Sequence, residues 1–363
     1  MESFKYSMKL ISFAVISLVI VLPACKTISQ VQFQVLEAPK VVIPSDINRF
    51  AFVYRNQHFP SDSVAQYYSI NKVSMKDSID HTQNMPQNCY QGFVENLSEF
   101  WTQDSIPFIS LPKKMMPDTA RHFTPLRWNI VDSLCKASQT DILIVLEDIQ
   151  AFNKHDIVEE DVYWASTEIH YYGKWRIYDP LYQKIYDDRL VVDSLFLETS
   201  DINLVRFLGG KLFSREQILN DASYVLGRGY VDLISPKWMD VRRNYFVSGD
   251  KRLSTAPYFI NKNEFDTAIK MWESLTGMGD NISKEKDLKL AGRAAYNLAV
   301  VYEMKGDIKK ARSWVRKAIY LYKKMKNRPS EYKEIEAYSL ALDSRWLNSE
   351  KIKLFFGEDP KAQ

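Results

Sequence analysis

The sequence predicts an α+β protein, in which a mixed α/β sheet domain with flanking helices is followed by an all-α domain. Three observations carry this prediction. Apolar segments of strand and helix period alternate between residues 35 and 245. Two long strand patterns flank the turn at Asp179-Pro180 and indicate an antiparallel hairpin. From about Leu253 only helical periodicity remains, with Lys and Glu on the outer faces.

The N-terminus has the pattern of a secretory leader. Lys5 and Lys9 precede an apolar stretch from Leu10 to Leu22, which is too short for an unaided membrane span. The tetrad Leu22-Pro23-Ala24-Cys25 resembles the lipobox of bacterial lipoproteins. This resemblance implies removal of residues 1–24, lipidation of Cys25 and a membrane as partner. An ordinary leader ending at Ala24 and an uncleaved signal anchor are the alternatives.

Composition limits what the mature chain can do. Without the leader, 339 residues remain, which by the usual size of domains indicates two domains. The formal charge of the whole chain is only +3, and this near-balance argues against a nucleic-acid partner. Lys26 follows Cys25 where many inner-membrane lipoproteins have Asp, which favours the outer membrane. Cys89 and Cys135 either form a disulfide or stay as buried thiols, and their spacing does not decide.

The first domain, residues 35–245, follows a polar lipidated tether at 25–34. The expected strands before the hairpin cover residues 31–36, 49–56, 106–111 and 141–146. One helical stripe runs from Asn88 to Trp101, and a second helix starts with Thr124 as N-cap and Pro125 in its first turn. These elements predict a sheet with helices packed against it.

The hairpin and the helix after it are the most distinctive part of this domain. Residues 168–177 alternate between a dry face with Tyr171 and Trp175 and a wet face, and residues 182–192 return as the partner strand. The aromatic side chains predict either a sugar-stacking or peptide-edge surface, or simple pairing across strands. A capping box at Ser214 to Gln217 opens a helix that stops at Ser235-Pro236. Its expected inward residues are Ile218, Leu219, Ala222, Val225 and Leu226.

The second domain, residues 253–350, resembles tetratricopeptide repeats. The positions that carry the resemblance are Leu298, Ala299, Tyr302, Gly306, Ala311 and Ala318. Small alanines let two antiparallel helices approach closely, Tyr302 fills the groove between them, and Gly306-Asp307 supplies the turn. A looser copy surrounds Ala268 and Trp272. A final helix from Ser330 to Asn348 caps the array, and residues 351–363 form a tail.

The whole chain also resembles known families. The lipobox, the α/β body and the repeat tail together resemble a family of uncharacterised lipoproteins from Bacteroides-like bacteria. At fold level, the body is similar to the α/β domain of envelope lipoproteins related to the curli secretion channel. Neither resemblance implies an activity.

A search for chemistry finds no catalytic, cofactor-binding or metal-binding residues to name. Zincin, nucleophile-elbow, phosphate-loop and paired-cysteine motifs are absent from the sequence. His155-Asp156 with Glu159, Glu160 and Asp161 comes nearest to a cation site, but it reads better as a solvated acidic loop between strands. No cofactor is expected, and the pattern leans away from an enzyme.

Two functions from different classes therefore remain. The first is a lipid-anchored envelope protein that scaffolds another envelope protein through the repeat tail or the exposed hairpin. The second is an envelope hydrolase or ligand-binding protein with its site between the two domains. Assembly of several copies into a ring is a third possibility.

Overall fold

The computed structural model describes residues 27–58, 67–71, 73–76, 82–97, 101, 103–117, 123–277 and 284–357. It confirms the predicted class, a mixed sheet domain followed by an all-helical region. The chain divides into two compact units. The sheet unit contains Leu36–Lys237 and the segment from Ser349, and the helical unit contains Trp238–Asn348 and the N-terminal segment up to Val35.

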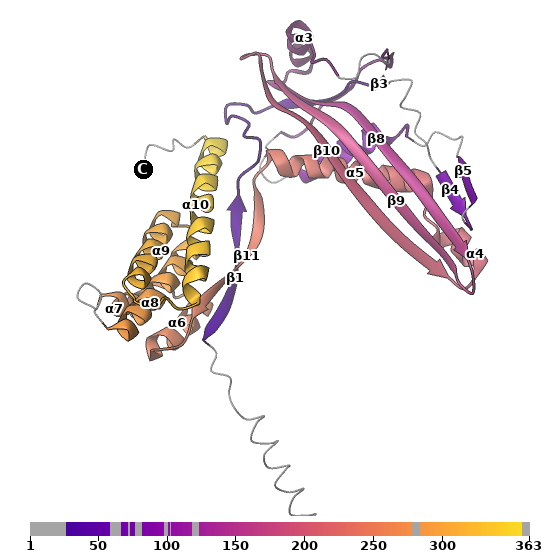
Figure 1. The fold of residues 1–363 in the computed structure, drawn as a ribbon. Coiled ribbons are helices and arrows are strands. Elements are labelled where there is room, and N and C mark those ends of the chain that lie inside the picture. The colour runs from indigo at the N-terminus through magenta and orange to yellow at the C-terminus, as the bar shows by residue number, and fades with distance from the viewer. Residues whose placement is uncertain are drawn as a thin grey trace, which may run out of the picture. The chain divides into compact units, whose positions relative to one another are not determined.

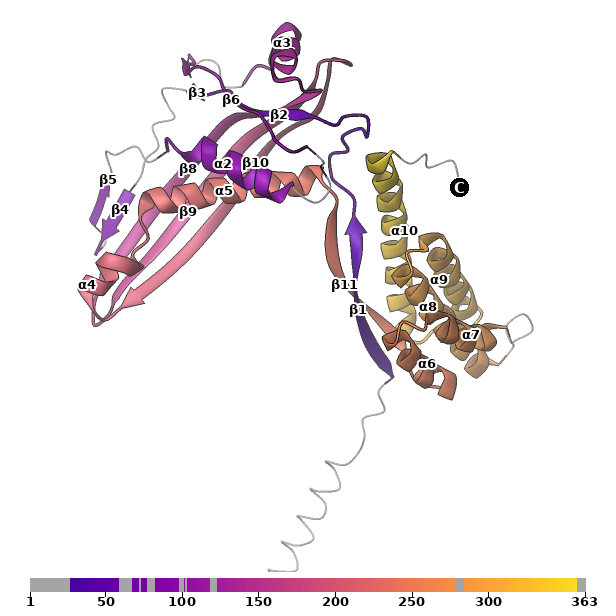
Figure 2. The ribbon, with the colours of Figure 1, turned by 180° about the vertical axis from the view of Figure 1, so that it is seen from behind.

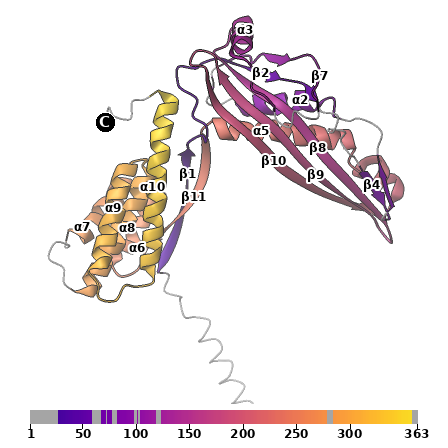
Figure 3. The same ribbon diagram turned by 45° about the horizontal axis from the view of Figure 1, so that its top comes forward.

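The main sheet of the sheet unit has the strand order β10-β9-β8-β2-β6. These strands are β2 (Phe50–Tyr54), β6 (Phe108–Ser110), β8 (Ile142–Glu159), β9 (Tyr163–Asp179) and β10 (Lys184–Asp201). Strand β2 pairs in parallel with both β6 and β8, whereas β8, β9 and β10 are antiparallel to one another. Figure 3 shows how far these last three strands extend. The long hairpin expected around Asp179-Pro180 is present as β9 and β10, and β10 is the edge strand of this sheet.

Shorter elements complete the sheet unit. They are β3 (Gln57–His58), β4 (Tyr67–Ile70), β5 (Val73–Lys76), β7 (Lys114–Met115), α4 (Leu204–Arg206) and the π-helical turn η2 (Phe207–Lys211). Strand β4 pairs with β5 and in parallel with the far half of β8, and β3 pairs with β7 in a separate small sheet. The segment 58–87, which lacks a clear period, thus contains a small hairpin.

Two helices cover one face of the main sheet. Figure 2 shows α2 (Met85–Asn96) and α5 (Arg215–Ile234) lying across β8, β9 and β10. They bury the dry face of the hairpin, where Trp175 stacks on Tyr230 with ring centroids 4.0 Å apart. The helices also touch backbone to backbone, because a Cβ on Gly227 would lie 1.8 Å from the carbonyl oxygen of Cys89. Gly227 is therefore a point of close contact between the two helices.

Helix α5 follows its predicted signals at both ends. Ser214 is the N-cap, and its Oγ accepts a hydrogen bond of 3.1 Å from the backbone N–H of Gln217. The helix ends at Ile234, before Ser235-Pro236. Four of its five expected core residues are buried, but Val225 lies at the edge of the stripe and is exposed.

On the opposite face of the sheet, α3 (Trp128–Ser138) packs at one end and is the only helix among the described residues that covers this face. The helix begins later than predicted, since Thr124 and Pro125 precede it and no side chain caps it. The segment before it is held extended by the sheet. Arg55 donates to the carbonyl of Thr124 (2.7 Å), and the hydroxyl of Tyr178 accepts from the N–H of Leu126 (3.1 Å).

Two other boundaries differ from the prediction. Helix α2 ends at Asn96, so Trp101 follows it; its indole packs edge-on against Phe50. Strand β8 continues to Glu159, so His155 and Asp156 lie inside a strand and not in an acidic loop. The loop prediction was wrong because pairing with both β9 and β4 extends the strand through its polar end.

The helical unit contains α6 (Lys251–Asn261), α7 (Phe265–Thr276), α8 (Glu285–Met304), α9 (Ile308–Lys323) and most of α10 (Glu331–Phe356). It also contains most of a two-stranded ribbon of β1 (Ile28–Glu37) and β11 (Lys237–Phe246). Residues 28–34 are therefore strand and not tether. Strand β11 was not predicted, and residues 351–356, expected in the tail, are helical.

Both remaining cysteines are free and buried, on opposite faces of the sheet. Burial raises the pKa of both thiols, that of Cys135 to about 11, which leaves them unreactive at neutral pH. Among the described residues, no helix combines the length and apolar character that a bilayer crossing requires.

Candidate functional site

The repeat positions named from the sequence meet at the α8–α9 hairpin, whereas Cys25 lies outside the described residues. Four of them are buried: Leu298, Ala299, Ala311 and Ala318. Gly306 forms the turn with φ +79°, a conformation that glycine adopts without steric cost. The ring of Tyr302 is half-buried against the clusters on both sides of α8, and the ammonium of Lys310 lies 5.4 Å from its centroid.

The first helices of successive helix pairs line one face of a stacked array, which is the face such arrays use for binding. In this chain the face formed by α8 and α10 is already occupied by β11. The side-chain amide of Asn297 accepts from the N–H of Phe246 and donates to its carbonyl, at 2.8 Å each. Asn297 and Phe246 are both almost completely buried, so this pair of bonds fixes an extended strand in the groove.

Charged side chains hold the same strand. Arg243 of β11 makes a bidentate ion pair of 2.8 Å with Glu303 of α8, which also accepts from the hydroxyl of Tyr338 on α10 at 2.7 Å. Burial, and then the charge of Glu303, raise the pKa of Tyr338 well above its ordinary value. Near the end of β11, Arg293 of α8 bonds to Ser248 and to Glu331 of α10. The groove residues thus bind the chain's own strand.

The sequence contained a signal for this site that was not recognised. Asn297 and Glu303 interrupt the apolar second half of α8, residues 294–304, and are buried, which polar groups tolerate only with partners. Their partner, β11, was missed because its sequence alternates poorly, with Arg242 and Arg243 adjacent.

The sheet unit presents the opposite situation. Beyond α3, the face of β8, β9 and β10 turned away from α5 is uncovered in the described part of the chain (Figure 1). Four large apolar side chains on it are exposed: Phe152 (43%), Leu190 (55%), Val192 (64%) and Phe196 (62%). The strand register places Leu190, Val192 and Phe196 along the edge strand β10 and Phe152 on β8, with β9 between them. Val192 lies beside Tyr172, and Phe152 and Phe196 occupy adjacent rows. We call this surface the open face.

The open face is not the aromatic surface considered from the sequence. Tyr171 and Trp175, the aromatics of the dry face, are buried beneath α5. On the open face the middle strand β9 carries polar side chains, because His170 bonds to Glu168 at 2.8 Å and Lys174 pairs with Asp188. The exposed apolar side chains lie on the two flanking strands, opposite these polar groups.

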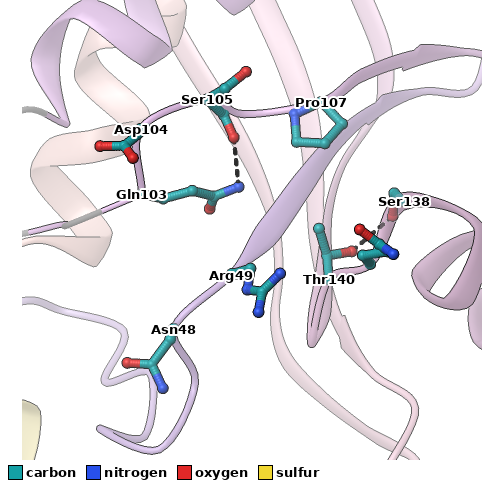
Figure 4. A pocket seen from close by; sticks show the side chains of 9 residues that line it. Asn48, Arg49, Gln103, Asp104, Ser105, Pro107, Ser138 and Thr140 are labelled. Carbon is teal, nitrogen blue, oxygen red and sulfur yellow. Dashed lines mark hydrogen bonds between the residues drawn. The ribbon is translucent and has the colours of Figure 1, made fainter.

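A polar cavity of about 430 Å³ lies at the amino ends of the parallel strands β2, β6 and β8 (Figure 4). Its lining residues are Asn48, Arg49, Gln103, Asp104, Ser105, Pro107, Ser138, Gln139 and Thr140. The hydroxyls of Ser138 and Thr140 bond to each other at 2.8 Å, and Gln103 bonds to backbone groups around it. No histidine or cysteine lines this cavity.

The buried ionisable groups under α3 are also fully engaged. Glu147 accepts from Arg55, from Arg176 at 3.1 Å and from the hydroxyl of Tyr178 at 2.7 Å. A carboxylate with three donors has little capacity left for a substrate. We therefore interpret Glu147 and its three donors as a network that stabilises the fold.

The residues considered for a cation do not converge. His155 is buried on the α5 side and bonds to Thr167 at 3.0 Å, whereas Asp156 points to the other face and pairs with Lys154 at 2.7 Å. Burial, and then the charge of Arg215, lower the pKa of His155 to about 4. Within the described ranges, no group of three or more His, Cys, Asp or Glu is placed to hold a metal ion.

These features define a class of protein, an α/β sheet domain with an open face joined to a helical unit that binds its own strand. The model described as "Domain of unknown function (DUF8603)" matches residues 47–246, more than half of the chain, and the chain belongs to that family. A second model, "Domain of unknown function (DUF6340)", matches residues 254–344. No curated protein matches this chain.

Solved structures with a similar arrangement are remote. The PelC dodecamer from Paraburkholderia phytofirmans is 7% identical with a TM-score of 0.22, over 57% of this chain and 98% of that one. A protein from Xanthomonas campestris of the family model DUF330 is 10% identical with a TM-score of 0.24, over 54% and 94%. Neither likeness bears on function.

Proposed function

We propose that this chain is a lipid-anchored envelope protein that scaffolds a second envelope protein by docking it on the open face. The observation that carries the proposal is the group of exposed Phe152, Leu190, Val192 and Phe196 on one uncovered sheet surface. Contiguous exposed apolar side chains are unfavourable in water unless a partner covers them.

The groove of the helical unit is the less suitable docking place. An incoming peptide would have to displace β11, together with the buried bonds of Arg243 to Glu303 and of Asn297 to Phe246. Breaking one partner of a buried ion pair costs roughly 3–5 kcal/mol. The repeat-like helices therefore serve to hold the β1–β11 ribbon, and the partner is expected on the hairpin.

The anchor is proposed at Cys25, through the lipobox Leu22-Pro23-Ala24-Cys25. Several acyl chains on one cysteine hold a protein on a membrane, since each buried methylene contributes about 0.8 kcal/mol. The compartment that fits Lys26 is the outer membrane. Metabolic labelling with palmitate should label the wild-type chain and leave the Cys25→Ser chain unlabelled. Equal labelling of both chains would mean that the lipid is attached at another residue, and absence of label from both would reject the lipid anchor.

Docking is tested by affinity purification of the full chain from detergent-solubilised native membranes. The triple variant Leu190→Ser, Val192→Ser, Phe196→Ser should lose the partner that the wild type retains in stoichiometric amount. A control variant removes exposed apolar groups of the helical unit with Tyr258→Ser, Leu340→Ser and Leu347→Ser. It should retain the partner. Loss of the partner in the control variant alone would reject the open face.

The alternative is an envelope hydrolase or ligand-binding protein with a site between the two domains. It stays a prediction. The cavity around Arg49, within the sheet unit, offers donors for a small anion.

A further inference from the structure

The near-neutral charge of the chain conceals an uneven distribution. Residues 238–348 contain 22 Lys and Arg against 14 Asp and Glu, whereas residues 36–237 contain 20 against 27. The helical unit is therefore strongly cationic, and the sheet unit is acidic. Clustered cations attract anionic surfaces when they are exposed and lack acidic neighbours.

The cations concentrate in one run of the helical unit. Between Asp307 and Glu331 the chain has nine Lys and Arg residues and no acidic residue. Its last part, the turn after α9, carries Lys323, Lys324, Lys326 and Arg328, all exposed. None of these four side chains has a salt-bridge partner within the described part of the chain. Two lie over aromatic rings, Lys324 over Tyr320 (4.5 Å) and Arg328 over Tyr332 (5.4 Å).

This turn lies at the end of the helical unit at which β1 begins. The backbone N–H of Lys326 donates to Glu285 in the first turn of α8 (3.1 Å). Further along α8, Arg293 reaches Ser248, and the N–H of the neighbouring Val247 donates to the carbonyl of Thr27 (3.0 Å). Figure 1 accordingly shows the start of β1 and the start of α10 at the same end of the unit.

The lipid attachment point is close to this end. Cys25 precedes the first residue of β1, Ile28, by only three residues. An extended chain of three residues spans about 10 Å. An acylated Cys25 therefore holds this end of the helical unit against the bilayer surface, with Lys251 and Lys286 also exposed there.

We infer that this cationic end, formed by Lys323, Lys324, Lys326, Arg328, Lys251 and Lys286, binds the anionic headgroups of the membrane to which the chain is anchored. The inference rests on the proposed lipid anchor for its geometry. Each Lys or Arg near an anionic leaflet strengthens binding about fivefold. The exposed ring of Tyr320 fits the same interface, where aromatic side chains are favoured.

A lipid surface fits these cations better than a macromolecule with a defined shape. The side chains project from helix ends and a turn and form a spread surface. Such an arrangement needs only a planar layer of negative charge.

The test uses the leaderless full chain with Cys25→Ser, so that no acyl group contributes. It is sedimented with vesicles of phosphatidylcholine alone or with about one third phosphatidylglycerol. We expect binding to the anionic vesicles only, falling as salt rises. The variant Lys323→Gln, Lys324→Gln, Lys326→Gln, Arg328→Gln should lower the partition coefficient by about 100-fold or more. Far-UV circular dichroism verifies that it folds.

The matched control removes four cations at the opposite end of the α8–α9 hairpin, with Lys270→Gln, Lys305→Gln, Lys309→Gln and Lys310→Gln. It should bind like the wild type. Equal weakening by both variants, or equal binding to neutral vesicles, would overturn the inference. Palmitate labelling decides the anchor separately, so vesicle binding without labelling would refute only the anchor, and labelling without vesicle binding would refute only the cationic end.

Discussion

The helical unit and the sheet unit differ in whether their candidate binding surface is occupied by the chain itself. In the helical unit, the face of α8 and α10 is filled by β11, and Asn297 and Glu303 are satisfied by that strand. In the sheet unit, Leu190, Val192 and Phe196 remain exposed on the part of the open face that lies beyond α3. A repeat-like groove therefore does not by itself indicate where a partner binds. What occupies the groove within the chain has to be known first.

The largest expected effect comes from opening the occupied groove. Glu303→Ala leaves Arg243 and Tyr338 buried without their shared acceptor, and should lower the free energy of unfolding of the helical unit by roughly 3–5 kcal/mol. Urea denaturation followed by circular dichroism measures it. The exposed Glu264→Ala should change the same quantity by less than about 0.5 kcal/mol. Similar values for both variants would mean that β11 is not held by this network.

A pH effect is expected in the sheet unit. The pKa of His155 is about 4 in the folded chain and about 6.5 when unfolded. The unfolded state binds the proton first, so stability is complete above pH 6.5 and falls by about 3 kcal/mol as pH drops to 4. His155→Gln should flatten this part of the stability curve. A curve unaffected by His155→Gln would contradict the buried neutral histidine.

A third prediction concerns the layer behind the open face. Gly227→Ala pushes α5 away from the backbone of α2 and should cost about 1–3 kcal/mol. Two residues on, Gly229→Ala meets no atom within 4 Å and should stabilise α5 by about 0.5–1 kcal/mol. Thermal denaturation of the two variants should therefore shift in opposite directions. Shifts of the same sign would disprove the close contact.

The smallest effect on stability is expected at the open face itself. Leu190→Ser, Val192→Ser and Phe196→Ser change exposed side chains, so each should alter the free energy of unfolding by about 0.5 kcal/mol or less. The same changes should abolish partner retention. A stability loss of several kcal/mol would show that another segment of the chain covers the open face, in the way that β11 covers the face of α8 and α10.

Local signals accounted for much of the fold. The cap at Ser214, the alternation around Tyr171 and Trp175 and the turn at Gly306 depend on residues a few positions apart, and the structure has all three. Pairings over long separations were not accessible. Strand β1 was recognised as a strand, but its partner β11 lies about two hundred residues later.

The candidate surfaces show the same limit. The hairpin was identified, but exposure on one of its faces depends on where α3 and α5 pack, which the strand pattern does not contain. The full-chain charge of +3 likewise gave no indication of the cationic end, because the acidic sheet unit offsets it. The open face and the cationic end are each formed by segments that lie far apart in the sequence, so both could be identified only from the folded structure.

The most direct test of the central claim is photo-crosslinking in intact cells from a benzoylphenylalanine at Val192 on the open face, with a second probe at exposed Tyr258 on α6. The account predicts one discrete protein adduct from position 192 and none from position 258. Adducts from position 258 with none from position 192 would contradict docking on the open face and return the helical unit to the role of partner-binding module.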